Sequence, residues 1–157
     1  MIEDVPLSRT PSRSASFAMR FLGRLDSFPL WILQLLFRIS IGAVFLSAGL
    51  TKIGSWQSTV ALFQNEYHVP LIPPVLAAYM ASAIELCCPI LLFVGLGTRL
   101  ATLPMLAQAF VIEIFVYPED WIEHLGWVAV LLFLFTRGPG LLSIDHLIKR
   151  SLEHADG

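Results

Sequence analysis

The sequence predicts an all-α integral membrane protein: a four-transmembrane-helix bundle with a short interfacial helix between helices 1 and 2 and a C-terminal juxtamembrane helix. Two observations favour this class. Of the 157 residues, 56% are hydrophobic and only 14% are charged, whereas soluble proteins average about 25% charged residues. The apolar residues also gather in long runs separated by Gly, Pro and charged residues. The net charge of −2 shows no basic excess, so we expect the lipid bilayer and no nucleic acid as a partner.

The predicted chain divides into three segments. Residues 1–28 form a flexible N-terminal tail, residues 29–140 the four-helix domain, and residues 141–157 a cytoplasmic helix and tail. Residues 17–28 carry apolar side chains at helical spacing, which predicts an interfacial helix, with a plain linker as the alternative. Because a polar segment precedes the first apolar run, we expect no cleaved secretory signal.

The first predicted span covers Leu30–Thr51, which at about 1.5 Å per residue is long enough for a hydrocarbon core about 30 Å thick. Residues 52–74 form the longest connection. Ser55 is placed to cap a helix whose apolar residues recur at steps of three and four, so we expect an amphipathic helix along the membrane surface. Pro73 and Pro74 are suited to open the next helix.

Three further spans and a terminal helix complete the predicted order. The spans cover Val75–Val94, Leu100–Tyr117 and Trp121–Thr136, and the last of these is short for a bilayer. Ser143 is expected to cap the terminal helix, with Asp145 in its first turn and basic residues near its end.

The distribution of basic residues predicts the orientation. All basic residues except Lys52 and Arg38 fall on one side of the predicted spans: Arg9, Arg13, Arg20, Arg24, Arg99, Arg137, Lys149 and Arg150. Loops rich in Lys and Arg stay on the cytoplasmic side of a membrane. We therefore predict a multi-pass protein with both termini in the cytoplasm.

Arg38 and Glu85 are the ionisable residues expected deep inside the first and second spans. A charge inside a bilayer costs at least about 2.5–3.5 kcal/mol, so it needs a partner, a cavity or a function. Because their depths in antiparallel helices roughly match, we predict an Arg38–Glu85 pair inside the bundle. Residues at helical spacing from either one are mostly small, which indicates a closely packed inner face: Gly42, Phe45, Gly49 and Lys52, and Ala78, Ser82 and Pro89. Two interpretations stay open: a polar site that holds a ligand or couples protons, and a salt bridge that fixes helix register.

Other polar residues lie near the ends of the spans. Lys52, Glu113, His124 and Arg99 are candidate ligand-binding residues. For Lys52 we favour an ammonium group that reaches out to the interface. The spacing matches no dedicated metal motif, so no metal is predicted; the side chains that could hold one in an outer polar cluster are Glu66, His68, Glu113 and His124. The sequence contains no phosphate-binding loop, catalytic triad signature or haem-attachment motif.

Several short motifs occur in a characteristic order. They are Arg38 followed by Gly42, Gly49-Leu-Thr-Lys52, Glu85, Gly95-Leu-Gly-Thr-Arg99, and Gly138-Pro-Gly140 followed by Ser143 and Asp145. With these motifs the chain resembles the DoxX family of small four-helix membrane proteins over about Leu36–Leu147. The segment Phe115-Val-Tyr-Pro118, followed by Trp121 and His124, is similar to a branch of the family found beside proteins that make metal-binding peptides.

The resemblance implies residence in the bacterial inner membrane and a link to redox or oxidative-stress systems. Relatives include small subunits of thiosulfate:quinone oxidoreductase. The family has no single common chemistry, so the resemblance assigns no catalytic residues to this chain. We expect a subunit that is not catalytic alone and that docks on a redox partner protein or a second copy of itself, with a quinone hydrogen-bonded by Arg38 and Glu85. The alternatives are a carrier for a small solute, ion or metal, and a structural membrane anchor.

Overall fold

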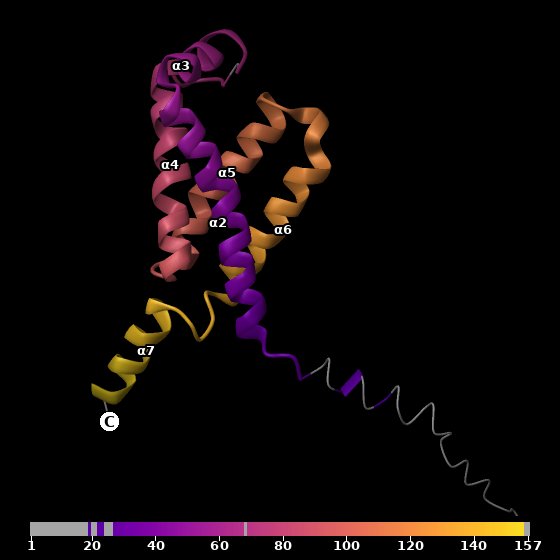
Figure 1. Cartoon of the computed structure of the whole chain (residues 1–157), viewed down its shortest axis with the longest axis vertical. Helices are drawn as coiled ribbons and strands as arrows, with labels where there is room; N and C mark the ends of the chain where they lie inside the picture. The colour runs from indigo at the N-terminus through magenta and orange to yellow at the C-terminus, as the bar shows by residue number, and fades with distance from the viewer. Residues whose placement is uncertain (1–18, 20–21, 24–26, 68, 156–157) are drawn as a thin grey trace, which may run out of the picture.

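The computed structural model describes residues 19, 22–23, 27–67 and 69–155. Helices make up most of this part of the chain (Figure 1), in the order α2 Leu30–Gly54, α3 Trp56–Asn65, α4 Pro74–Val94, α5 Thr98–Phe115, the short 3-10 helix η1 Pro118–Asp120, α6 Trp121–Arg137 and α7 Ile144–Ala155. The predicted all-α class is confirmed. The predicted N-terminal tail and its interfacial helix lie largely outside the described residues.

Three of the described helices, α2, α4 and α5, are long and apolar enough to cross a membrane. The shortest of them, α5, has 18 residues and is therefore about 27 Å long. Helix α6 has 17 residues. The outer sides of these helices carry large apolar side chains with about half of their surface exposed, such as Leu36, Leu50 and Phe110. A surface of this kind is stable in lipid and not in water, so the chain is a membrane-embedded protein.

Helices α2 and α4 pack through the faces predicted from the sequence. Arg38, Gly42, Phe45 and Gly49 are buried on α2, and Ala78, Ser82, Glu85 and Pro89 are buried on α4. A Cβ atom added at Gly49 would lie 3.0 Å from the Cβ of Glu85, and one at Gly42 would lie 2.6 Å from the ring of Phe93. The two glycines therefore let the helices approach closely.

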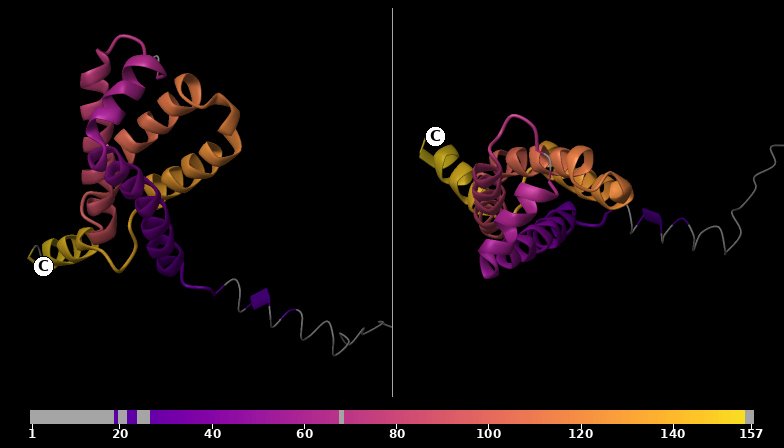
Figure 2. Two further views of the ribbon diagram at one scale, coloured as in Figure 1. Left: turned by 45° about the horizontal axis from the view of Figure 1, so that its top comes forward. Right: turned by 90° about the horizontal axis from the view of Figure 1, so that it is seen from above.

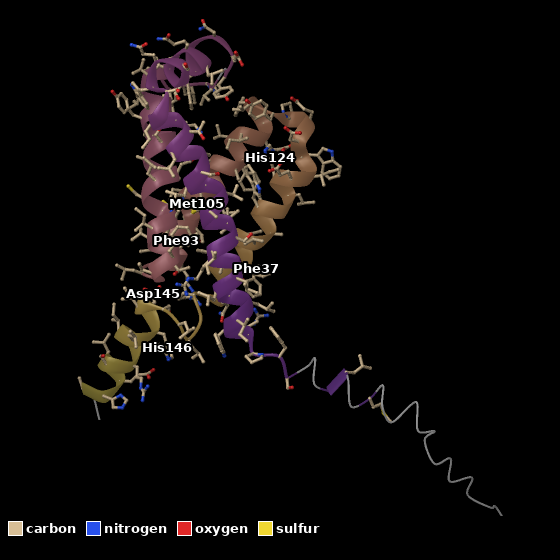
Figure 3. All side chains as sticks on the ribbon, in the orientation of Figure 1. Phe37, Phe93, Met105, His124, Asp145 and His146 are labelled. Atoms are coloured by element: carbon tan, nitrogen blue, oxygen red, sulfur yellow. The ribbon has the colours of Figure 1, made fainter. Side chains whose placement is uncertain are left out.

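Helices α5 and α6 form a hairpin through η1, which closes the core on the other side. Helix α5 packs on α4, and α6 packs on α2. The fully buried centre contains Leu92, Met105, Leu131 and Leu134, and Figure 3 shows Met105 at mid-height of the bundle. Towards the end that carries α3, the hairpin leans away from α2 and α4 (Figure 2). We call this the α3 end and the opposite one the α7 end.

At the α7 end, the side chain of Arg38 joins three parts of the chain. It is 1% exposed. Its guanidinium donates to the carbonyl oxygens of Leu92 at 2.6 Å and Phe93 at 2.7 Å, in the last turn of α4, and to those of Pro139 at 3.1 Å and Leu142 at 2.6 Å, before α7. A positive charge is favourable at the C-terminal end of a helix, where carbonyl groups lack partners. Arg38 thus fixes α4 and the segment before α7 to α2.

The turn between α4 and α5 is held by the start of α7. The carboxylate of Asp145 accepts hydrogen bonds from the backbone N–H groups of Gly97 at 2.7 Å and Thr98 at 3.0 Å, and so caps α5. Ser143 Oγ accepts from the N–H of His146 at 3.1 Å, which confirms the predicted cap of α7. Ser55 occupies the N-cap position of α3, but its side chain makes no capping hydrogen bond.

We expect Arg38→Lys to lower the free energy of unfolding by at least about 1–3 kcal/mol. A lysine ammonium holds its donors on one nitrogen and cannot span all four carbonyl groups, and each buried acceptor left unpaired costs about that amount. Thermal unfolding in detergent measures the change. Arg150→Lys, the same replacement at an exposed position of α7, is the control. An unchanged Tm for Arg38→Lys would show that these contacts do not hold the fold.

Candidate functional site

A cavity of about 200 Å³ lies between α2, α4, α5 and α6 at the α3 end. Its lining is mostly apolar, and Phe45, Phe63, Ile112 and Trp127 are its largest apolar side chains. The polar side chains that reach it come from separate parts of the sequence: Lys52, Tyr67, Glu85, Gln108, Tyr117 and His124. This enclosed space brings together most of the polar groups that the sequence places inside or near the spans, so it is the candidate functional site.

Glu85 is the centre of a polar triad formed by three helices. Its Oε1 accepts hydrogen bonds from Lys52 Nζ of α2 at 2.7 Å and from Gln108 Nε2 of α5 at 2.6 Å. The close approach of α2 and α4 at Gly49, one turn before Lys52, brings the lysine within reach of the carboxylate. Glu85 and Gln108 are 2% and 8% exposed. The triad therefore holds a paired charge in the interior of the bundle.

Two acceptor atoms of this triad have no partner. Glu85 Oε2 and Gln108 Oε1 are buried, and neither forms a hydrogen bond within the part of the chain that the structure describes. Burying a polar group without a hydrogen bond costs about 1–3 kcal/mol. Most buried polar groups in proteins are paired for this reason. Since both residues line the cavity, a molecule in it with a hydrogen-bond donor could satisfy them.

A second polar pair lies on the α5–α6 hairpin, and one of its members, His124, lines the same cavity. His124 Nδ1 lies 2.6 Å from Glu113 Oε2, and the His124 ring is 4.8 Å from the ring of Trp127. Figure 3 shows His124 on α6 near the tip of the hairpin. The short η1 turn reverses the chain and sets these two residues of α5 and α6 at one level. The predicted proximity of Glu113 and His124 is confirmed.

Two tyrosines connect the segment after α3 to the segment after α5 beside the cavity. The hydroxyl groups of Tyr67, after α3, and Tyr117, after α5, lie 2.8 Å apart, and their ring centres 5.8 Å apart. Burial, together with the hydrogen bond to Tyr117, raises the pKa of Tyr67 above its ordinary value. Tyr67 therefore stays protonated at neutral pH, and the pair joins α3 to the hairpin through a neutral hydrogen bond.

A second cavity of about 310 Å³ adjoins the first and opens between α4 and α5 beneath α3. The two share Phe63, Val69, Ala81, Gln108 and Val111 as lining residues. The other residues that line the second cavity are apolar: Ile72, Ala77, Met80, Ile84, Pro104 and Ala107. Met80 and Ala107 are exposed on the outside of the helices. The second cavity therefore lies between Gln108 of the polar triad and the exposed outer side of α4 and α5.

The predicted Arg38–Glu85 pair is wrong, because each residue has other partners. Arg38 binds the carbonyl of Leu92, which lies two turns of α4 beyond Glu85, about 10 Å along the helix. Lys52 takes the place that the prediction gave to Arg38. The expectation that Lys52 reaches outward to the interface is also wrong, since its ammonium group turns into the bundle.

The remaining predicted residues are distributed over both ends. Arg99 is exposed at the α7 end and donates to the carbonyl of Thr136 at 3.2 Å, so it is not part of the cavity. Glu66 is exposed, and His68 lies outside the described residues. Among the residues that the structure describes, no group of three or more His, Cys, Asp and Glu side chains is placed to hold a metal ion.

The sequence prediction missed three residues of the site: Gln108, Tyr67 and Tyr117. Gln108 had a usable signal, because an amide in the middle of an apolar helix needs a partner as a charge does. The tyrosines had none, since Tyr and Trp are expected at any membrane interface.

Comparisons with known proteins agree with the resemblance noted above. The sequence model of the DoxX family matches residues 33–118, which is more than half of the chain. An uncharacterized protein of Haemophilus influenzae is 30% identical over 126 aligned residues, covering 74% of this chain and 83% of that protein. No solved structure matches the chain. The matched region runs from the start of α2 through the end of α5 and contains the triad, and the chain therefore belongs to the DoxX family.

Proposed function

We propose that this DoxX family protein is a quinone-binding membrane subunit of a redox system and is not catalytic by itself. The observation that carries the proposal is an apolar cavity lined by Glu85 and Gln108, each of which has one buried oxygen without a hydrogen-bond partner among the described residues. Pockets for drug-sized ligands measure about 300–1,000 Å³. A cavity of about 200 Å³ instead suits one substituted ring, which is the size of a quinone head group.

The polar triad has partners for both oxidation states of such a ring. The Lys52 ammonium has donors beyond the one used on Glu85, so it can donate to a quinone carbonyl. Glu85 Oε2 and Gln108 Oε1 can accept hydrogen bonds from a quinol hydroxyl. Phe45 and Trp127 offer aromatic edges and faces to the ring itself. A hydrated ion fits less well, because an apolar lining offers few groups to replace its water shell.

The second cavity supplies a place for the chain that membrane quinones carry. It adjoins the first cavity and is apolar almost throughout, and it reaches the outer surface between α4 and α5. The head group would enter sideways from lipid with its chain behind it. This arrangement explains why a cavity with a polar end adjoins one in which, among the residues that the structure describes, only the shared Gln108 is polar.

The proposed membrane placement has four spans, α2, α4, α5 and α6, in a bacterial inner membrane. Helix α3 then lies at the outer interface, α7 lies at the inner one, and both termini are cytoplasmic. The charge distribution supports this orientation: Arg99, Arg137, Lys149 and Arg150 lie at the α7 end, and Glu66, Glu119, Asp120 and Glu123 lie at the α3 end. The redox partner, or a second copy of the chain, would dock within the same membrane.

Cysteine labelling tests the four spans. In a chain carrying Cys87→Ser and Cys88→Ser, we expect Glu119→Cys to react with a membrane-impermeant maleimide in intact spheroplasts. Glu153→Cys should react only after the membrane is opened, because α6 returns the chain to the cytoplasm. Labelling of Glu153→Cys in intact spheroplasts would show that α6 does not cross.

Replacement of Gln108 by leucine tests the head-group site. Gln108→Leu keeps the volume but removes the unpaired acceptor and, with it, the hydrogen bond to Glu85. We expect a quinol with a short chain to bind about 5–15-fold more weakly, as for a lost hydrogen bond of about 1–1.5 kcal/mol. Titration calorimetry on the purified protein in detergent measures the affinity. Gln64→Leu, on the exposed side of α3, is the matched control. Equal affinity for wild type and Gln108→Leu would argue against this cavity as the quinone site.

Filling the second cavity tests the route of the chain. Ala107 lines only that cavity, so Ala107→Phe should weaken binding of a long-chain quinone by about fivefold or more, as expected for overpacking by about 1–3 kcal/mol. A quinone without a chain should bind as before. Ala83→Phe, exposed on another face of α4, is the control. If both quinones lose affinity equally, the chain does not pass between α4 and α5.

A further inference from the structure

The α7 end carries a second hollow, separate from the proposed quinone site. It has a volume of about 690 Å³ and lies between the start of α2, the start of α5, the end of α6 and α7. Arg99, Arg137 and Lys149 line it, and among the described residues Asp145 is its one acidic lining residue. The carboxylate of Asp145 is occupied by the N–H groups of Gly97 and Thr98. We call this hollow the basic cleft.

The guanidinium of Arg99 lies against the backbone on either side of Arg137 in the basic cleft. The backbone at Arg137 is fixed by Gln34, whose Nε2 donates to the carbonyls of Arg137 at 3.2 Å and Gly138 at 3.1 Å. The guanidinium of Arg99 donates to the carbonyl of Thr136 and would lie 3.5 Å from a Cβ atom at Gly138. Within residues 27–67 and 69–155, no carboxylate forms an ion pair with either arginine. Two arginines that line one cleft without an ion-paired carboxylate favour binding of an anion.

Apolar side chains surround the same cations. Trp31, Leu100 and Leu141 line the basic cleft, and Leu100 is 73% exposed. Helix α7, which starts at the cleft (Figure 3), carries an exposed apolar stripe that includes Leu147 and Leu152. A helix with such a stripe opposite a charged polar face lies along the lipid head groups. The cleft therefore combines a site for a negative charge with a surface for hydrocarbon chains.

We propose that the basic cleft binds the phosphate group of an anionic phospholipid, with Arg99 and Arg137 around the phosphate and the acyl chains along Trp31 and Leu100. Lys149, whose ammonium lies 3.8 Å from Glu153, stands at the edge of the site. Arginine is suited to this role because its planar fork matches two phosphate oxygens. Basic pockets between membrane helices bind lipid head groups in the same way. Bound lipid would hold α7 close to the C-terminal residues of α6 and to the bilayer. The inference does not depend on quinone binding at the α3 end.

Native mass spectrometry of the full chain in nonionic detergent tests the proposal. Phosphatidylglycerol should bind more tightly than phosphatidylcholine. Arg137→Gln should weaken phosphatidylglycerol binding about fivefold, the effect of one basic residue near a membrane surface. Arg150→Gln, one charge less on α7 but outside the basic cleft, is the matched control and should change it little. Arg99→Gln should weaken phosphatidylglycerol binding in the same way. Should that variant fail to fold, Arg99→Lys, which keeps the charge, should still bind phosphatidylglycerol more tightly than phosphatidylcholine.

Three results would overturn the proposal. Equal binding of phosphatidylglycerol and phosphatidylcholine would exclude recognition of the anionic head group. Equal loss in Arg137→Gln and Arg150→Gln would show a diffuse charge effect rather than a site. Inorganic phosphate binding as tightly as phosphatidylglycerol would show a site for the free anion, without a role for the acyl chains.

Discussion

The fold depends on one buried guanidinium group. Arg38 lies inside a bundle whose surroundings offer no water, and it is stable there because four backbone carbonyl groups accept its hydrogen bonds. Two of these carbonyls end α4 and two precede α7, so a single side chain sets the positions of both relative to α2. The capping of α5 by Asp145 then follows, because Asp145 comes directly after the segment that Arg38 holds.

The two ends of the bundle differ in how well their polar groups are satisfied. At the α7 end, the buried Arg38 has partners of the chain itself, and its role is structural. At the α3 end, Glu85 pairs with Lys52 and Gln108 but leaves Oε2 without a partner next to a cavity. This contrast separates the interpretations that the sequence left open for the intramembrane charges: Arg38 holds the fold, and Glu85 belongs to the proposed ligand site.

Much of the helical architecture could be predicted, and less of the site. Helix ends were predicted to within a few residues, because Gly, Pro and capping residues mark them: the second predicted span, Val75–Val94, is α4 Pro74–Val94. The buried faces of α2 and α4 were also predicted, since helical periodicity determines which residues share a face. The pairing of the buried polar side chains with one another was not predicted from the sequence. Lys52 was assigned to the interface, and Gln108 was left out of the site.

The sequence by itself determined the membrane-embedded class, the helices and the sides of α2 and α4 that turn inward, because hydropathy and periodicity are local properties of a chain. Only the tertiary structure decided which polar groups meet. That choice depends on how α2 and α4 are aligned along each other. Lys52 and Arg38 lie about four turns apart on α2, and the observed alignment sets Lys52 beside Glu85 and Arg38 beside the end of α4. The partners of Arg38 are backbone carbonyls, which every residue has, so no pattern of side chains could reveal them. The cavity depends on the lean of the α5–α6 hairpin, which arises from packing among helices distant in the sequence.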